Sequence, residues 1–343
     1  MQFAKFIYDN YPGLVKNLGL LEFATFPPYR PLYQKQIDRK MQGFLKGAIT
    51  VEFEVTNKCN ADCIMCPNGV MERPTQRMEM PLFMQIVDEF ALKNPPLLKF
   101  VFAGLGEPTL DPLLPEKISY LKAKFPHVPV QITTNASLLT ASRSKELINA
   151  GLDQIIISFN GTTKESYEKV MGQMNYDKNL ANILQLLPLR VGGRPQLTIS
   201  CVRLDANAAD FAGMEKFWKE KGVQVDRLKT PVPFNRGGEQ MLSRYKSKWA
   251  LPKPTKPRQL LPCRMMAENI LIHPNGSVVL CFVDYEEKVV MGQFGKNSLQ
   301  EIMQTKANWY ERHKQGDFSH TPLCKNCSFM REQVVAWWQD EYF

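Results

Sequence analysis

The sequence predicts an α/β fold in which six strand–helix units precede a small α+β domain. Short apolar runs alternate with helical patterns as far as Lys229, a basic stretch rich in proline and glycine follows, and a cysteine-bearing segment closes the chain. Strands that alternate with helices pair in parallel through right-handed crossovers. Six such units form either a partial β/α barrel or an open doubly wound sheet, and periodicity alone does not distinguish the two.

The expected strands are short apolar or β-branched runs. They lie at residues 51–55, 98–103, 128–133, 154–159, 197–202 and 225–229. Amphipathic patterns between them predict helices at 80–93, 113–125, 142–151, 166–187 and 210–222. Residues 1–46 carry aromatic and basic side chains without a clear period. We interpret them as a helical extension packed on the barrel, with a partner-docking arm or a peripheral membrane contact as alternatives.

The rhythm ends after Lys229, where the composition becomes that of a linker. From Arg227 to Arg264 there are ten Lys or Arg residues and one acid, Glu239. Such a stretch attracts an acidic partner or an anionic substrate, or it keeps a solvated linker soluble.

Beyond the linker, His-Pro-Asn-Gly at 273–276 predicts a β-hairpin. A helix is expected at 298–313, and the CKNC pair at 324–327 precedes a short aromatic-rich helix. So small a domain gains from a stapling metal cluster. The expected division of the chain is an extension at 1–46, a barrel at 47–230, a linker at 231–262 and a cluster domain at 263–343.

The eight cysteines indicate metal binding. No apolar run approaches the ~18 residues of a membrane span, and the first residues lack the apolar core of a secretory signal. We therefore expect a cytoplasmic protein, in which thiols stay reduced and do not form disulfides. The four histidines form no HxxxH or HExxH pair, which disfavours a histidine-based metal site.

Three cysteines, Cys59, Cys63 and Cys66, lie within eight residues after the first expected strand. Three thiolates hold three irons of a 4Fe–4S cube and leave the fourth iron open to a small molecule. A structural zinc site needs four ligands, and unligated thiols this close together are an oxidation liability. The triplet therefore predicts an iron–sulfur loop.

The segment CNADCIMCP (59–67) resembles the cluster loop of the radical S-adenosylmethionine (SAM) superfamily. This resemblance implies a partial (β/α)6 barrel, SAM bound to the unligated iron, and reductive cleavage of SAM to a 5′-deoxyadenosyl radical. It also implies a reductant protein such as flavodoxin or ferredoxin. Met65 stands where the family often has a bulky residue near the adenine.

Other segments resemble the SAM-binding motifs of the family in the same order. AGLGEP (103–108) is similar to the GGE motif, TTNASLL (133–139) to the TNG segment with Ala136 in place of glycine, and SFNG (158–161) to the SxDG segment. The cofactor-binding residues implied by the resemblance are Gly104, Gly106, Glu107, Asn135, Ser158 and Asn160.

One position departs from the family pattern. Many relatives have an Arg-Gly after the fourth strand that pairs with the SAM carboxylate, whereas this chain has Met171 before Gly172. Lys169, Arg194 or Arg203 would have to supply the missing cation.

The remaining clustered cysteines, Cys263, Cys281, Cys324 and Cys327, make a second four-thiolate set. They resemble the SPASM and shorter twitch domains, which hold auxiliary 4Fe–4S clusters, and their number suffices for one fully ligated cluster. A structural zinc site with the same thiolates is the alternative. A fully ligated cluster is suited to accept an electron from a substrate radical, which favours a net oxidation.

Cys201 belongs to neither set. If it points into the barrel, its thiol can return a hydrogen atom to a substrate radical, as in an epimerase; otherwise it is a small apolar filler. Arg203 lies two residues on, on the same side of a strand, and is a candidate anion contact. Arg236 and Tyr245 are further candidates, and a solvated surface position is the alternative for all three.

We expect a radical SAM oxidoreductase acting on a small anionic or polar metabolite such as a sugar, cyclitol or phosphorylated compound. A peptide substrate stays open, although residues 1–46 are short for a leader-binding module. A non-catalytic iron–sulfur electron carrier is disfavoured because it needs no SAM pocket. Nucleic-acid modification lacks evident stacking platforms.

Overall fold

The computed structural model describes residues 30–223, 226–229, 231, 233, 247–248, 250 and 262–328. Six strands follow one another along the chain and pair in parallel, each with the next. They are β1 (Thr50–Phe53), β2 (Lys99–Phe102), β3 (Val130–Thr134), β4 (Gln154–Ser158), β5 (Gln196–Ser200) and β6 (Arg227–Lys229). All six expected strands are confirmed to within a few residues.

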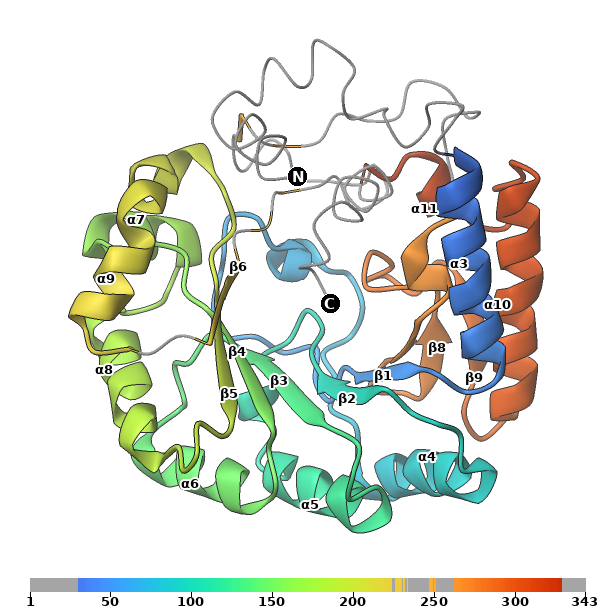
Figure 1. Cartoon of the computed structure of the whole chain (residues 1–343), viewed down its shortest axis with the longest axis horizontal. Helices are drawn as coiled ribbons and strands as arrows, with labels where there is room; N and C mark the ends of the chain where they lie inside the picture. Colours follow the sequence, from blue (N-terminus) through green and yellow to red (C-terminus); the bar gives the residue numbers. More distant parts are fainter. Residues whose placement is uncertain are drawn as a thin grey trace.

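Helices cover the outer side of this curved sheet (Figure 1). They are α4 (Met80–Lys93), α5 (Leu114–Lys124), α6 (Ala141–Asn149), α7 (Lys164–Met171), α8 (Tyr176–Leu186) and α9 (Met214–Glu220), with a 3-10 segment η5 (Asp205–Gly213) before α9. Shorter 3-10 turns are η2 (Pro67–Val70), η3 (Pro108–Leu110), η4 (Leu187–Leu189) and η8 (Arg264–Met266). A doubly wound sheet would carry helices on both faces. The helices on one side therefore identify a partial barrel.

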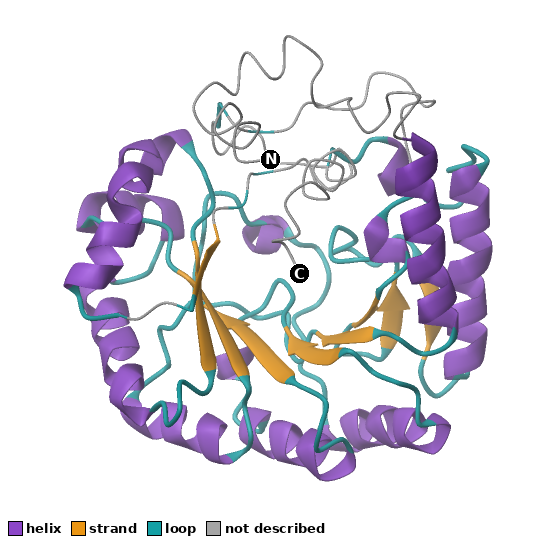
Figure 2. Ribbon diagram, viewed as in Figure 1, coloured by secondary structure: helices purple, strands orange, loops and turns teal. Residues whose placement is uncertain are grey.

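The C-terminal segment continues the same sheet (Figure 2). Strand β7 (Asn269–Ile272) pairs in parallel with β1, and β8 (Ser277–Val279) and β9 (Val290–Gln293) add antiparallel. The result is one nine-stranded sheet in the order β6-β5-β4-β3-β2-β1-β7-β8-β9. The predicted hairpin at 273–276 is confirmed, and α10 (Leu299–Lys314) and α11 (Pro322–Lys325) follow.

Strand β1 separates an apolar face from an acidic one. Val51 and Phe53 are fully buried in the core, where the Phe53 ring lies 5.0 Å from that of Phe83 on α4. Glu52 and Glu54 alternate with them and therefore lie on the opposite face, toward the barrel interior. The sheet thus brings two carboxylates to the inside of the barrel beside the cluster loop.

The N-terminal helix α3 (Arg30–Leu45) packs on the C-terminal part of the chain. Ile37, Met41 and Phe44 form its buried stripe, and Tyr310 of α10 donates a 2.9 Å hydrogen bond to Asp38. Residues 30–45 of the expected extension therefore form a helix that docks on α10, and residues 1–29 lie outside the described residues. Within the described ranges no helix is both long and apolar enough to cross a bilayer.

Candidate active site

The cluster loop begins where β1 ends and is fastened to the loop after β2. The Glu107 amide donates to the Lys58 carbonyl at 2.9 Å. A side chain at Gly106 would place its Cβ only 2.0 Å from the Thr56 oxygen. The glycine expected to let the backbone approach SAM is thus required here for close packing of the two loops.

The Glu107 carboxylate is buried and well supplied with donors. Oε1 accepts from the Thr109 and Thr134 hydroxyls, both at 2.6 Å, and Oε2 accepts from the Asn135 amide at 2.7 Å. Burial raises the pKa of Glu107, and these hydrogen bonds oppose the rise. Only one of the described donors reaches Oε2, so this oxygen retains acceptor capacity for an ammonium group.

The loop after β3 holds the cluster loop from a second side. Asn135 donates to Asn60 at 2.9 Å, and Asn60 donates to Ser137 at 2.8 Å. Ala136, which replaces the glycine of the family pattern, has φ +64°. This left-handed conformation is one that glycine adopts more readily than alanine. The departure noted in the sequence therefore coincides with backbone strain.

The end of α7 holds the cluster loop from a third side. The Asp62 amide donates to the Gly172 carbonyl at 3.1 Å, and a Cβ at Gly172 would lie 2.2 Å from the Asp62 oxygen. The Met171 sulfur lies 3.8 Å from Cys63 Sγ and 2.8 Å from the Asn160 amide nitrogen. Met171 thus packs against a cluster cysteine where many relatives carry an arginine.

The three candidate replacements for that arginine lie in different places. Arg194 precedes β5 and therefore lies at the amino ends of the strands, opposite the end that carries the cluster loop. Its side chain is 77% exposed beside Asp153. This position is wrong for a SAM contact because SAM motifs follow the strands. Lys169 is exposed on α7, and the Arg203 guanidinium lies 5.5 Å from the Phe211 ring centre.

The thiols of the triplet influence one another electrostatically. Burial raises the pKa of Cys59 to about 11, and the charge of Cys66 adds to the rise. Burial, Cys66 and Cys59 likewise raise the pKa of Cys63 well above its usual range. Such grouped, half-buried thiols ionise readily only when a cation neutralises them, so the donor set fits an iron cluster.

The four cysteines of the quartet line one small apolar pocket. The other lining residues are Met265, Met266, Leu280, Val283 and Leu323. Burial and neighbouring thiols raise the pKa of Cys281 to about 12, and those of Cys263 and Cys324 rise well above the usual range for the same reasons. Across the described ranges no three His, Cys, Asp or Glu side chains converge on the point that a single metal ion would occupy.

Cys201 directly follows β5 and continues the face of the strand that carries Leu197 and Ile199. All three side chains belong to the same core cluster, and Cys201 is fully buried. Its sulfur accepts a 3.6 Å hydrogen bond from Asn207, and burial strongly raises the pKa of its thiol. This placement favours the apolar-filler interpretation over hydrogen donation into the barrel.

The remaining predicted SAM contacts lie around the cluster loop. Met65 is half-buried and packs on the cluster formed by Val170 and Leu204. Ser158 ends β4 opposite Ser200 of β5, and Asn160 accepts from the Val202 amide at 2.7 Å. Asn160 therefore links the ends of two strands as well as contacting Met171. Arg236 and Tyr245 lie outside the described residues.

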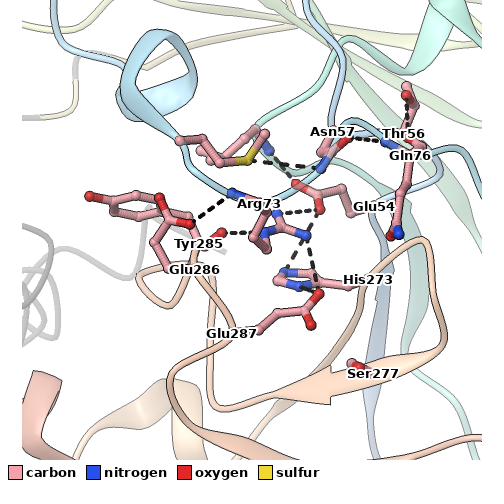
Figure 3. Close-up of polar contacts among 12 residues, drawn as sticks. Glu54, Thr56, Asn57, Arg73, Gln76, His273, Ser277, Tyr285, Glu286 and Glu287 are labelled. Carbon is pink, nitrogen blue, oxygen red and sulfur yellow. Dashed lines mark hydrogen bonds and ion pairs between the residues drawn. The ribbon is translucent and has the colours of Figure 1, made fainter.

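A polar cluster that sequence reasoning missed joins the cluster loop to the C-terminal hairpin (Figure 3). Arg73 lies between Glu54, at 2.8 Å, and Glu287, at 3.2 Å. His273 Nδ1 lies 2.9 Å from Glu287. The available signal was Glu52 and Glu54 in an otherwise apolar strand; their partners are up to 219 residues away.

Comparison with known proteins agrees with this geometry. Residues 53–192 match the model of the radical SAM superfamily, and residues 263–328 match that of the SPASM iron–sulfur cluster-binding domain. The chain is a radical SAM enzyme with a C-terminal SPASM-type domain. The two domains imply a 4Fe–4S cluster in each and SAM at the first.

Among its relatives is the S-adenosyl-L-methionine-dependent 2-deoxy-scyllo-inosamine dehydrogenase of Niallia circulans, 24% identical over 83% of this chain and 94% of the relative. Two solved structures share the fold. BtrN in complex with AdoMet and 2-DOIA has a TM-score of 0.57 and 22% identity over 81% of this chain and 92% of its own. Native anSMEcpe with bound AdoMet and Cp18Cys peptide has a TM-score of 0.60 and 15% identity over 82% and 89%.

Proposed function

We propose that this radical SAM enzyme carries out a net two-electron oxidation of a hydroxylated small molecule, such as a sugar or cyclitol. Reductive cleavage of SAM supplies a hydrogen-abstracting 5′-deoxyadenosyl radical. The substrate then loses one hydrogen atom, one proton and one electron, and the alcohol becomes a carbonyl.

The observation that supports this proposal is a pocket lined by segments next to both cluster sites. Gly104 and Leu105, in the loop that resembles the GGE motif, line it together with Phe282, which follows the quartet residue Cys281. A substrate held there would contact one segment proposed to bind SAM and another that adjoins the proposed electron acceptor. The burial of Cys201 in the core adds support, because a hydrogen-returning epimerase needs a thiol on the substrate side.

The relative from Niallia circulans is named as a cyclitol dehydrogenase, and the match covers nearly its whole length. This similarity favours a cyclitol substrate. The anSMEcpe structure contains a peptide, so a peptide is the competing substrate. The pocket is lined in part by Glu52, Glu54 and His273, side chains suited to hydrogen-bond hydroxyl or amine groups.

The test is anaerobic. Reconstituted enzyme should bind about eight irons per chain, and reduction in the presence of SAM should yield 5′-deoxyadenosine. With 2-deoxy-scyllo-inosamine deuterated at its carbinol carbons, deuterium should appear in 5′-deoxyadenosine alongside a ketone. Formation of 5′-deoxyadenosine without deuterium from this or other cyclitols, but with deuterium from a labelled peptide, would overturn the proposed substrate class.

A further inference from the structure

His273 lines the same pocket, to which segments next to both cluster sites contribute. It follows β7 and lines the pocket together with Glu54, which follows β1, and Tyr285, which lies beyond the quartet residue Cys281. Its side chain is only 2% exposed. Strands β1 and β7 pair in register, so the side chains of Glu54 and His273 leave the sheet side by side.

The two ring nitrogens of His273 face different partners. Nδ1 lies 2.9 Å from Oε1 of Glu287, whereas Nε2 lies 3.8 Å from Oε2 of Glu54. The first distance is a hydrogen bond and the second is too long for one. A substrate hydroxyl about 2.8 Å from Nε2 would donate its one proton to that nitrogen.

Glu287 fixes the ring in this orientation. Its carboxylate also accepts from Asn275 at 3.1 Å and pairs with Arg73 at 3.2 Å. The hydrogen bond from His273, that from Asn275 and the charge of Arg73 lower the pKa of Glu287 to about 2, so this carboxylate is ionised and accepts only. Nδ1 therefore donates to Glu287, and Nε2 is the ring nitrogen left on the side of Glu54 and the pocket.

Backbone strain at Glu287 accompanies these contacts. The residue has φ +57°, in the left-handed region. Strain of this kind persists only where surrounding contacts hold it, and it clusters at functional sites. Arg73 supplies one such contact and also donates through Nε to the Tyr285 carbonyl.

We propose that His273 is the proton acceptor for a substrate hydroxyl bound in this pocket, with Glu287 as its positioning residue. This inference rests on the proposed oxidation and adds the group that takes the proton. A carboxylate that holds one imidazole nitrogen while the other accepts a proton is a recurrent arrangement in enzymes.

In the proposed step a hydrogen atom, a proton and an electron leave the substrate separately. The substrate C–H bond would break homolytically, its hydrogen atom passing to the 5′-deoxyadenosyl radical that bound SAM would supply. The O–H proton of the resulting hydroxyl-bearing carbon radical passes to Nε2 of His273, where a new N–H bond forms. The auxiliary 4Fe–4S cluster, which Cys263, Cys281, Cys324 and Cys327 would hold, would accept the one remaining electron as the C=O bond is completed. The imidazolium is stabilised by Glu287 and later loses its proton to solvent.

The charge around the pocket indicates the substrate class. Glu52 and Glu54 contribute two carboxyl groups, and no Lys or Arg of the described ranges lines the pocket itself. This lining favours a neutral or amine-bearing polyol over the anionic substrate that the basic linker suggested. Glu54 then accepts a second hydroxyl or an ammonium group of the same ligand.

The first experiment needs no substrate. Oxidised holoenzyme containing 15N-labelled histidine is titrated by NMR, with His273 assigned by comparison with His273→Asn. The charged or titratable groups packed around the ring are Glu54 from β1, Arg73 from the loop before α4, and Tyr285 and Glu287 from the loop after β8. If His273 accepts the substrate proton, Nδ1 carries a proton and Nε2 carries none in the resting enzyme at pH 7.5, and this preference is lost in Glu287→Gln. A proton on Nε2 at pH 7.5, alone or with one on Nδ1, would overturn the proposal.

The second experiment uses deuterated 2-deoxy-scyllo-inosamine as the probe. In His273→Asn, ketone formation should fall about 100-fold or more, while deuterium transfer into 5′-deoxyadenosine stays within about threefold. The exposed His127→Asn is the matched control and should match the wild type. Ketone formation by His273→Asn at the wild-type rate would sink the idea. If the wild type itself transfers no deuterium, the proposed function fails for this cyclitol, and the NMR result still decides the state of His273.

Discussion

The two cysteine sites are assembled in different ways. Cys59, Cys63 and Cys66 come from one loop of eight residues, which the loops after β2, β3 and α7 hold from three sides. Cys263, Cys281 and the Cys324–Cys327 pair come from three places along 65 residues, brought together by the hairpin and α11. The first site is a feature of local sequence, whereas the second exists only once the chain has folded.

This difference has a chemical counterpart. Three thiolates leave one iron open for SAM, and the surrounding loops supply the acceptors that SAM needs. Four thiolates in an apolar pocket leave no open position, which suits electron transfer. Disruption of the first site should therefore abolish chemistry with little effect on folding, and disruption of the second should affect folding, product formation or both.

The largest effect separates the two sites directly. Cys63→Ala should abolish formation of 5′-deoxyadenosine, because the first cluster loses a ligand, while about four irons per chain remain. The melting temperature should change little, because backbone hydrogen bonds still hold the loop.

Cys324→Ala is the matched change at the buried second site. It should also leave about four irons, but it should retain SAM cleavage, lose the oxidised product and lower the melting temperature clearly. Iron analysis, chromatography of the nucleoside and thermal unfolding under anaerobic conditions check both variants. If Cys63→Ala still cleaved SAM, the roles assigned to the two sites would be wrong.

Arg73 connects the two regions, and its removal should have the next largest effect. Its side chain is 8% exposed and pairs with Glu54 and Glu287. Arg73→Met leaves two carboxylates without their shared cation, which should cost about 3–5 kcal/mol of unfolding free energy. Denaturant unfolding of the anaerobic holoenzyme measures it.

Arg77→Met is the control, because Arg77 is 42% exposed and lies 3.6 Å from the exposed Glu79. Its cost should stay below about 1 kcal/mol. Equal losses in the two variants would show that the Arg73 pairs do not hold the regions together.

Much of this arrangement could be predicted from the sequence. The helix at 80–93 and the hairpin at 273–276 were correctly placed because, like the cysteine spacing, they depend on neighbouring residues. The parity of Cys201 with Leu197 and Ile199 was also readable and indicates the core face. Arg194 precedes its strand, which was a readable sign against a SAM contact.

Other features depend on contacts distant in sequence and could not be predicted. Arg73 and Glu287 are separated by 214 positions, and no periodic pattern links them. The docking of α3 on α10 depends on the apolar stripe of Ile37, Met41 and Phe44 meeting a surface made more than 260 residues later. The β7–β1 pairing places the C-terminal segment beside the start of the barrel.

His313 should make the stability of the second region depend on pH. Its ring is 1% exposed, lies 2.5 Å from the Thr321 hydroxyl and packs on Phe318. Burial lowers the pKa of His313 to about 4. Below about pH 6.5 the unfolded chain therefore binds a proton that the folded chain does not. The free energy of unfolding thus decreases as the pH is lowered, down to about pH 4, where the folded chain binds the proton as well.

At pH 5 the loss attributable to His313 should be about 2 kcal/mol. Comparison of unfolding at pH 7.5 and pH 5 for the wild type and His313→Gln measures it, because the variant should lose less on acidification. His320→Gln, at an exposed position, should follow the wild type. The same pH response in wild type and His313→Gln would contradict the assignment.

The smallest effect concerns the strained loop of the first site. Ala136 has φ +64° and lies between Asn135 and Ser137, which bond to the cluster loop through Asn60. A left-handed alanine costs about 1–2 kcal/mol, whereas the added freedom of glycine in the unfolded chain costs about 0.4–1 kcal/mol. Ala136→Gly should therefore stabilise the protein by about 0.5 kcal/mol.

Ala181→Gly, at an exposed position inside α8, supplies a control of opposite sign and should destabilise by about 1 kcal/mol. Asn182 of the same helix donates to the Ala136 carbonyl at 2.9 Å, so the loop keeps its anchor in both variants. Denaturant midpoints of the two variants decide the matter. A loss of stability in Ala136→Gly as large as that in Ala181→Gly would mean that the lost methyl contact outweighs the backbone strain, and that the first site is held by packing as closely as the second.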